Sequence, residues 1–132
     1  MRHTIALLRQ HGIRPTPQRL AVAQAALAGK GHPSAEDVLG RVRRRHPTVS
    51  RATVYNTLNL FVEKGLLKQQ WLTEGNAVFD AEVHPHHHFI DNQTGEICDV
   101  PWEFLRVTGE KSLREFEVTE VQVVLRGRRR KR

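Results

Sequence analysis

With 132 residues, the chain is long enough for one ordinary domain or two small ones, and its core must be modest. A single cysteine excludes an internal disulfide and any cysteine-rich zinc module, and no stretch approaches the roughly 18 apolar residues of a membrane helix. Because the first residues include no apolar signal segment, we expect a cytoplasmic protein with no membrane partner.

The net charge of +7 is unevenly distributed. Residues 1–79 carry 12 Lys and Arg against 4 Asp and Glu, residues 80–125 carry 3 against 10, and residues 126–132 carry 6 basic residues and no acidic one. A basic first part is typical of a protein that binds a polyanion such as nucleic acid. The acidic part fits metal binding or self-association. The basic tail, expected to be disordered, would add salt-sensitive affinity for phosphate or only confer solubility.

Local capping signals predict helices at the start of the chain. The first predicted helix covers residues 3–10. Thr16 followed by Pro17 predicts the start of the second, because a capping hydroxyl precedes a proline at the first helical position. Ser34, with acidic residues in the turn behind it, predicts a capping box at the start of the third.

The fourth helix is predicted to begin after Ser50 and to end at Gly65, with apolar residues recurring at helical spacing between them. Residues 66–72 and 77–80 then read as two strands joined by a turn at residues 73–76. Helices followed by a two-stranded wing are typical of a winged helix-turn-helix domain.

The pattern changes in the second half of the chain. Residues 86–91, 96–100 and 116–125 are predicted to be strands, with a short helix around residues 102–107. The whole chain is therefore expected to be α+β, with a hinge near residues 80–85.

Residues 80–99 gather four histidines between flanking aspartates. In an extended segment alternate side chains share a face, so His86 and His88 can reach one ion while His87 points away. Imidazole and carboxylate ligands suit Fe, Mn, Zn or Ni. The alternative is a solvated histidine run. His84 and His87 are expected to face solvent, and Cys98 to be a packed strand residue.

The predicted fourth helix carries polar side chains suited to DNA. The second helix of a helix-turn-helix places its N-terminal residues against base edges in the major groove. Phosphate or base contacts are therefore expected from Arg14, Arg51, Thr53, Tyr55 and Asn56. The alternative is a helical bundle whose basic faces are merely solvated.

Five runs of residues together resemble the ferric uptake regulator (Fur) family, in the same order and spacing: Gly12–Arg19, His32–Val38, Ser50–Leu58, Phe79–Asp80 and His86–Phe89. The resemblance implies an N-terminal winged helix-turn-helix DNA-binding domain (residues 1–80), followed by a small α/β dimerisation domain (residues 81–125) that binds metal. It also implies a homodimer that represses transcription at a double-stranded DNA operator of inverted-repeat character.

By position, the resemblance places one regulatory metal site per protomer on His32, Asp80, His86, His88 and Asp99. The expected ion is Fe(II) or Mn(II), with Zn(II) or Ni(II) able to bind in vitro. Aspartates at both acidic positions are similar to the peroxide-sensing PerR-like members. In these members, peroxide reacting with bound Fe(II) oxidises a ligand histidine, at positions matching His32 and His86.

The chain also departs from the family pattern. Most members hold a structural zinc with two Cys-x-x-Cys pairs, but Asp91 and Thr94 stand at the first pair and arginines replace the second, so we expect no structural zinc. The histidine run also resembles the haem-responsive Irr branch, which makes haem an alternative cofactor. A non-haem iron enzyme using two histidines and a carboxylate, and a DNA-binding protein with a vestigial metal site, are further alternatives.

Overall fold

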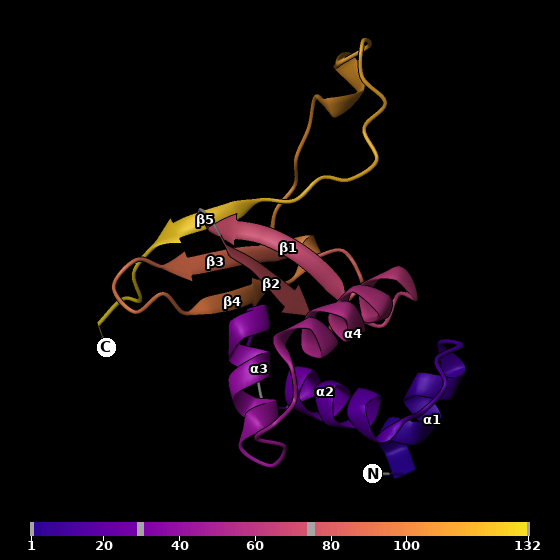
Figure 1. Ribbon diagram of the computed structural model, residues 1–132. Helices are drawn as coiled ribbons and strands as arrows, with labels where there is room; N and C mark the ends of the chain where they lie inside the picture. The colour runs from indigo at the N-terminus through magenta and orange to yellow at the C-terminus, as the bar shows by residue number, and fades with distance from the viewer. Residues whose placement is uncertain (1, 29–30, 74–75, 132) are drawn as a thin grey trace. The chain divides into compact units, whose positions relative to one another are not determined.

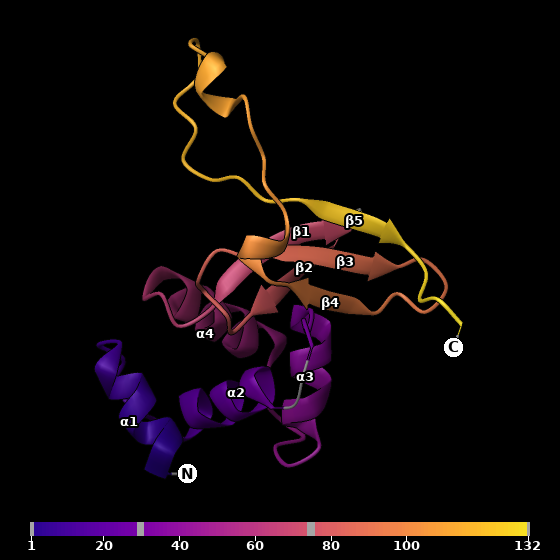
Figure 2. The same cartoon turned by 180° about the vertical axis from the view of Figure 1, so that it is seen from behind.

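The computed structural model describes residues 2–28, 31–73 and 76–131, and the chain divides into two compact units, residues 1–83 and residues 84–132. The first unit contains helices and a two-stranded antiparallel sheet, and the second contains a three-stranded sheet (Figures 1 and 2). Among the described residues, none of the helices has the length and apolar character needed to cross a bilayer.

Capping side chains set the helix starts in the first unit. Thr16, Ser34 and Ser50 each accept a hydrogen bond from the backbone N–H three residues later, which confirms the three predicted N-caps. Gly65 has a φ of +78°, a backbone conformation that glycine adopts without strain, and it follows the last helix as predicted. The helices are α1 (Arg2–Gln10), α2 (Pro17–Leu27), α3 (Ala35–Arg43) and α4 (Arg51–Glu63).

One apolar core holds these helices together. Every helix contributes to it, because its buried members include Leu8, Val22, Val38, Val54, Leu58 and Phe61. On α4 the buried residues recur at helical spacing, so the opposite face, with Tyr55 and Asn56, is left exposed.

Strands β1 (Lys68–Thr73) and β2 (Asn76–Asp80) pair antiparallel after α4, as expected of a wing. Residues 74 and 75 of the predicted turn lie outside the described residues. The strand β2 also contacts the segment before α3, where Ser34 forms an isolated antiparallel bridge with Val78 and the Phe79 N–H donates to the Pro33 carbonyl at 2.8 Å. This bridge fixes the register between the two segments.

The second unit is built on a sheet with β3 at its centre. Strand β3 (His87–Asp91) pairs antiparallel with β4 (Ile97–Val100) and parallel with β5 (Val124–Gly127). The two outer strands are distant in sequence, and β5 includes the first two residues, 126 and 127, of the tail that was expected to be disordered.

The segment between β4 and β5 differs from the prediction. The expected helix at 102–107 is only a single 3₁₀ turn, η1 (Trp102–Phe104), and a second turn, η2 (Glu110–Ser112), follows. The strand expected at 116–125 begins only at Val124. Residues 111–120 are all exposed, and a strand requires a neighbour to complete its backbone hydrogen bonds. This segment makes a long excursion away from the sheet of its own unit (Figures 1 and 2).

Candidate functional site

The first unit brings together a histidine and an aspartate that are 48 positions apart. Continuing the register of the Ser34–Val78 bridge by two residues places His32 opposite Asp80. His32 Nε2 lies 3.2 Å from Asp80 Oδ2, and the side chains are only 4% and 5% exposed. The other Asp80 oxygen, Oδ1, accepts a hydrogen bond from the Glu82 N–H at 2.9 Å. The strand β2 therefore ends in a buried, oriented carboxylate.

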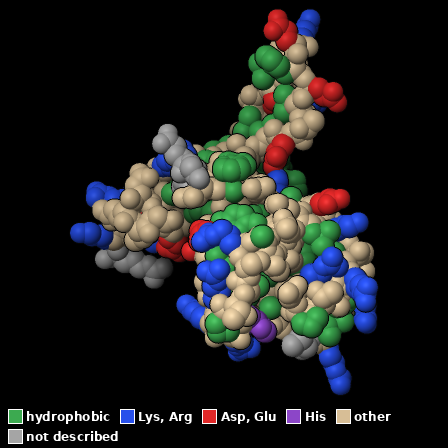
Figure 3. All heavy atoms as spheres, in the orientation of Figure 1, with side chains coloured by type: hydrophobic (Ala, Val, Ile, Leu, Met, Phe, Trp, Pro, Cys, Tyr) green, Lys and Arg blue, Asp and Glu red, His purple; other side chains and the backbone are tan. Residues whose placement is uncertain are grey.

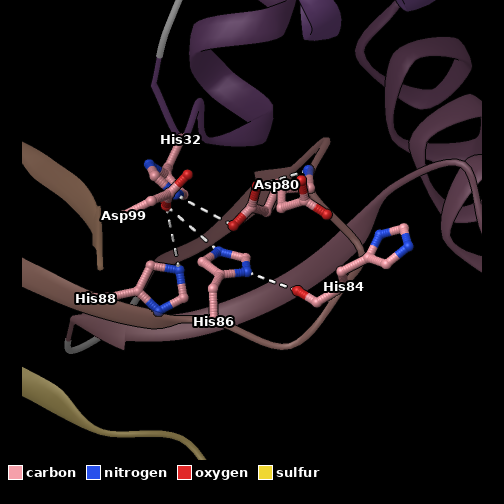
Figure 4. Close-up of polar contacts among 7 residues, drawn as sticks. His32, Asp80, His84, His86, His88 and Asp99 are labelled. Carbon is pink, nitrogen blue, oxygen red and sulfur yellow. Dashed lines mark hydrogen bonds and ion pairs between the residues drawn. The ribbon is translucent and has the colours of Figure 1, made fainter. Parts of the chain in front are cut away.

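The second unit brings together two histidines and an aspartate by strand register. His88 on β3 pairs directly with Asp99 on β4, and His86 lies two residues before His88 on the same face. Asp99 Oδ1 lies 3.3 Å from His86 Nε2 and 3.8 Å from His88 Nε2. Each of the three residues offers a ligand atom within 4.8 Å of the other two. Figure 4 shows both imidazoles turned toward the carboxylate of Asp99.

The hydrogen bonding of His86 indicates that a cation fits this cluster. His86 Nδ1 lies 2.7 Å from the His84 carbonyl oxygen, which can only accept, so Nδ1 carries the proton (Figure 4). In the neutral ring Nε2 is then a bare lone pair facing the Asp99 oxygen, which is repulsive. A metal ion or a second proton between the two atoms removes that repulsion, and a carbonyl on the far nitrogen is the usual outer partner of a metal-bound histidine.

The structure thus places the five predicted ligands in two sets, His32 with Asp80 in the first unit and His86, His88 and Asp99 in the second. Both sets consist of nitrogen and oxygen donors, which suit Fe, Mn, Zn or Ni.

The expectation that His87 faces solvent is wrong. Its side chain is fully buried, its ring stacks on Trp102 with centroids 4.7 Å apart and planes tilted by 17°, and its Nδ1 accepts a hydrogen bond from the Val123 N–H at 2.9 Å. Strand alternation does turn His87 away from its two neighbours, but η1 and the residue before β5 cover that side. His84, in contrast, is exposed as expected.

The two residues that stand where the family carries its first cysteine pair close a turn between β3 and β4. Asp91 Oδ1 accepts hydrogen bonds from the N–H groups of Gln93 (2.8 Å) and Thr94 (3.2 Å), and Thr94 Oγ1 accepts one from the Glu96 N–H (3.2 Å). The bond from Gln93, aided by that from Thr94 and by Arg129, holds the pKa of Asp91 below its ordinary value despite desolvation. These side chains do not fit a thiolate-bound zinc.

Cys98 is half-buried on β4, as expected of a packed strand residue. Its Sγ lies 3.1 Å from Arg129 Nη2. Burial, with the nearby charge of Glu96, raises the pKa of the Cys98 thiol despite Arg129. A raised pKa keeps the thiol protonated, and a thiol is a weaker ligand and nucleophile than a thiolate.

The residues predicted to contact DNA lie in the first unit, four of them in the first two turns of α4. All are exposed except the half-buried Thr53, whose Oγ1 accepts a hydrogen bond from the Ser50 hydroxyl at 2.9 Å. Figure 3 shows several Lys and Arg side chains on the visible face of the helical unit. The exposed face of α4 therefore carries the expected donors.

Sequence reasoning missed Glu36, in the first turn of α3. Its Oε1 accepts a hydrogen bond from the Tyr55 hydroxyl at 2.8 Å and forms an ion pair with Arg51. Its position in the sequence could have revealed Glu36. The two helices of a helix-turn-helix cross, so an acidic residue in the first turn of α3 can reach the start of α4.

The sequence pattern of the Ferric uptake regulator family matches residues 10–126. The chain is 32% identical to the peroxide-responsive repressor PerR of Staphylococcus aureus (strain Mu50 / ATCC 700699), over 96% of this chain and 87% of that protein. The ferric uptake regulator of Pseudomonas aeruginosa with manganese superposes with a TM-score of 0.70 at 31% identity, over 96% of this chain and 97% of that one. A zinc-bound manganese uptake regulator also gives 0.70, at 24% identity, over 96% and 98% of the two chains.

These relationships confirm the expected α+β fold, a winged helix-turn-helix domain followed by a small α/β dimerisation domain. They also exclude the enzyme alternative, because the relatives are regulators. The chain belongs to the ferric uptake regulator family of metal-responsive transcriptional regulators.

Proposed function

We propose that this protein is a metal-dependent, DNA-binding repressor that leaves its operator when peroxide oxidises a ligand histidine, His32 or His86. The observation that carries the proposal is the convergence of His86 and His88 on Asp99, with the His84 carbonyl fixing the His86 tautomer. Support comes from the S. aureus relative, which is named a peroxide-responsive repressor.

We propose further that both ligand sets bind the same ion, one per protomer. Neither set alone supplies ligands for all of the four to six coordination positions that Fe(II) or Mn(II) prefers. Only five residues separate Asp80 from His86, so their Cα atoms can never be more than about 20 Å apart. An ion bound by both sets would select one arrangement of the two units, and binding to one of several arrangements shifts the population toward it.

Each ligand set suits the proposed peroxide chemistry. If these residues hold Fe(II), the ion would supply the electron that activates hydrogen peroxide beside an imidazole, whereas Mn(II) would do so poorly. In the net reaction the histidine ring gains one oxygen atom, the peroxide loses one, and water is released. Oxidation of His32 or His86 removes a nitrogen ligand, which releases the selected arrangement and lowers affinity for DNA.

On the DNA side, α4 would enter the major groove with Arg51, Thr53, Tyr55 and Asn56 toward the bases, while Arg14 contacts the backbone. A homodimer would place two such helices on an inverted repeat. The basic first part of the chain makes this binding strongly salt-dependent.

The binding test begins with selection of an operator. The Mn(II)-loaded protein is used to enrich duplexes from a randomised inverted-repeat library, and affinity for the enriched duplex is compared with that for a scrambled one. We expect clear discrimination that the double variant Arg51→Ala, Tyr55→Ala loses. Failure to enrich any sequence would refute specific DNA binding.

The sensing test treats the Fe(II) and Mn(II) forms with stoichiometric peroxide. Peptide mass spectrometry should find one added oxygen on His32 or His86 only in the iron form, with loss of operator binding in the same sample. Release from DNA without histidine oxidation would overturn the peroxide mechanism. Release on addition of haem alone would favour the haem-responsive alternative.

A further inference from the structure

One carboxylate oxygen on α3 engages two side chains of α4. Glu36 Oε1 pairs with the guanidinium of Arg51 and accepts the hydrogen bond of the Tyr55 hydroxyl. Arg51 and Tyr55 are four positions apart in a helix, so their side chains lie one above the other on the same face. Glu36 therefore restrains together two of the side chains proposed to read DNA.

This contact contributes little to stability. The side chains of Glu36 and Arg51 are both 57% exposed, and exposed ion pairs are weak because water screens them and holding two long side chains has an entropic cost. We expect its effect on DNA binding to be larger. Residues 1–79 hold only four acidic side chains, and Glu36 is one placed beside the N-terminal end of α4, the end proposed to approach DNA. A carboxylate there repels phosphate and occupies the nearest arginine.

We propose that Glu36 is a positioning residue for operator recognition. It holds Arg51 and Tyr55 in one arrangement and penalises their use as general phosphate contacts, so that binding to non-operator DNA is suppressed more than binding to the operator. Specificity is a difference of affinities, and an element that acts against the wrong partner increases it. The planar guanidinium must also be oriented to bond a guanine edge with two hydrogen bonds. The inference rests on the proposed DNA binding by α4.

The test uses Glu36→Ala and Glu36→Gln in the full Mn(II)-loaded protein, with the selected operator and a scrambled duplex of equal length at several salt concentrations. For Glu36→Ala we expect tighter binding to scrambled DNA and an operator preference reduced by about fivefold or more, the loss of one good base contact. The salt dependence on scrambled DNA should steepen by roughly 0.9 per protomer, because Arg51 becomes free to contact a phosphate. Glu36→Gln, which keeps an acceptor for Tyr55, should lose less of the preference.

The matched control is Glu63→Gln, which removes the same charge from an exposed position in the last turn of α4. It should strengthen both affinities about equally and leave the operator preference unchanged. In an Arg51→Ala, Tyr55→Phe background, Glu36→Gln should behave like Glu63→Gln, because the side chains through which Glu36 acts are absent.

Two outcomes separate this inference from the proposed function. If the wild-type protein shows no operator preference, specific DNA binding itself is refuted. If the wild type discriminates but the Glu36 variants match Glu63→Gln in preference and salt dependence, only the positioning role of Glu36 is overturned. Circular dichroism establishes that the variants are folded, and if Glu36→Ala is not, Glu36→Gln decides.

Discussion

The backbone N–H of Val123 donates a hydrogen bond to Nδ1 of His87, 36 residues earlier in the chain. This bond joins β3 to the start of β5 from the side opposite His86 and His88. With the stacked ring of Trp102, it encloses the His87 side chain completely. His87 therefore supports the strand that carries the proposed ligand His88 and that directly follows the proposed ligand His86.

Replacement of His87 should destabilise the second unit in two separable ways. His87→Ala removes a buried ring and should lower the free energy of unfolding by about 2–4 kcal/mol. His87→Phe keeps the stack but leaves the Val123 N–H unpaired, at a cost of about 1–3 kcal/mol. Urea unfolding with a chelator, followed by Trp102 fluorescence in a Trp71→Phe background, measures both. If the two variants lose the same free energy of unfolding, the hydrogen bond from Val123, and not the stacked ring, makes the main contribution of His87 to stability.

Replacement of a metal ligand should weaken metal binding without unfolding the chain. His86→Ala should lower Mn(II) affinity by at least tenfold, since even loss of an outer partner costs about 10–100-fold. The control is His84→Ala, because it keeps the backbone carbonyl that bonds His86 Nδ1. Isothermal titration calorimetry measures both affinities. An unchanged affinity in His86→Ala, or an equal loss in His84→Ala, would contradict the assignment.

The turn after β3 should make stability depend on pH through Asp91. Its pKa is lowered in the folded state, so the ionised carboxylate stabilises the fold. This contribution is complete above the unfolded-state pKa, near 3.8, and is lost as the pH falls through the lower folded-state pKa. Asp91→Asn should therefore reduce Tm most at neutral pH, and the difference should shrink in acid. Glu115→Gln, at an exposed position, is the charge control, and a pH-independent difference in Asp91→Asn would refute the argument.

Loss of the α4 cap should destabilise the first unit. Ser50 Oγ accepts from the Thr53 N–H at 3.1 Å, and Ser50→Ala should lower the free energy of unfolding by about 1 kcal/mol. Ser50→Asp keeps an acceptor and places a negative charge where the helix dipole favours it, so it should be close to wild type. Urea titration compares the two variants, and an equally large loss in Ser50→Asp would argue against the cap.

The sequence predicted what local chemistry determines. The caps at Thr16, Ser34 and Ser50 depend on residues within one turn, so they could be read directly. Alternation along an extended segment likewise predicted that His86 and His88 share a face. The pairing of His32 with Asp80 came only from the resemblance, because the bridge between Ser34 and Val78 has no local signal.

The errors share one cause. The burial of His87 depends on Trp102 and Val123, which reach it only through the fold. The strand expected at 116–125 forms only from Val124, where it pairs with β3. In each case the outcome depended on tertiary contacts that periodicity and propensity do not specify.

The turn closed by Asp91 and Thr94 has a consequence for oxidative damage. A turn held by zinc and thiolates can be opened by peroxide, because thiolates are oxidised through sulfenic to sulfinic acid. A carboxylate and a hydroxyl undergo no such oxidation, and the raised pKa of Cys98 keeps that thiol in its less reactive form. Peroxide that reaches the second unit should therefore leave the β3–β4 turn intact. Oxidation of a ligand histidine would then alter DNA binding while the second unit stays folded.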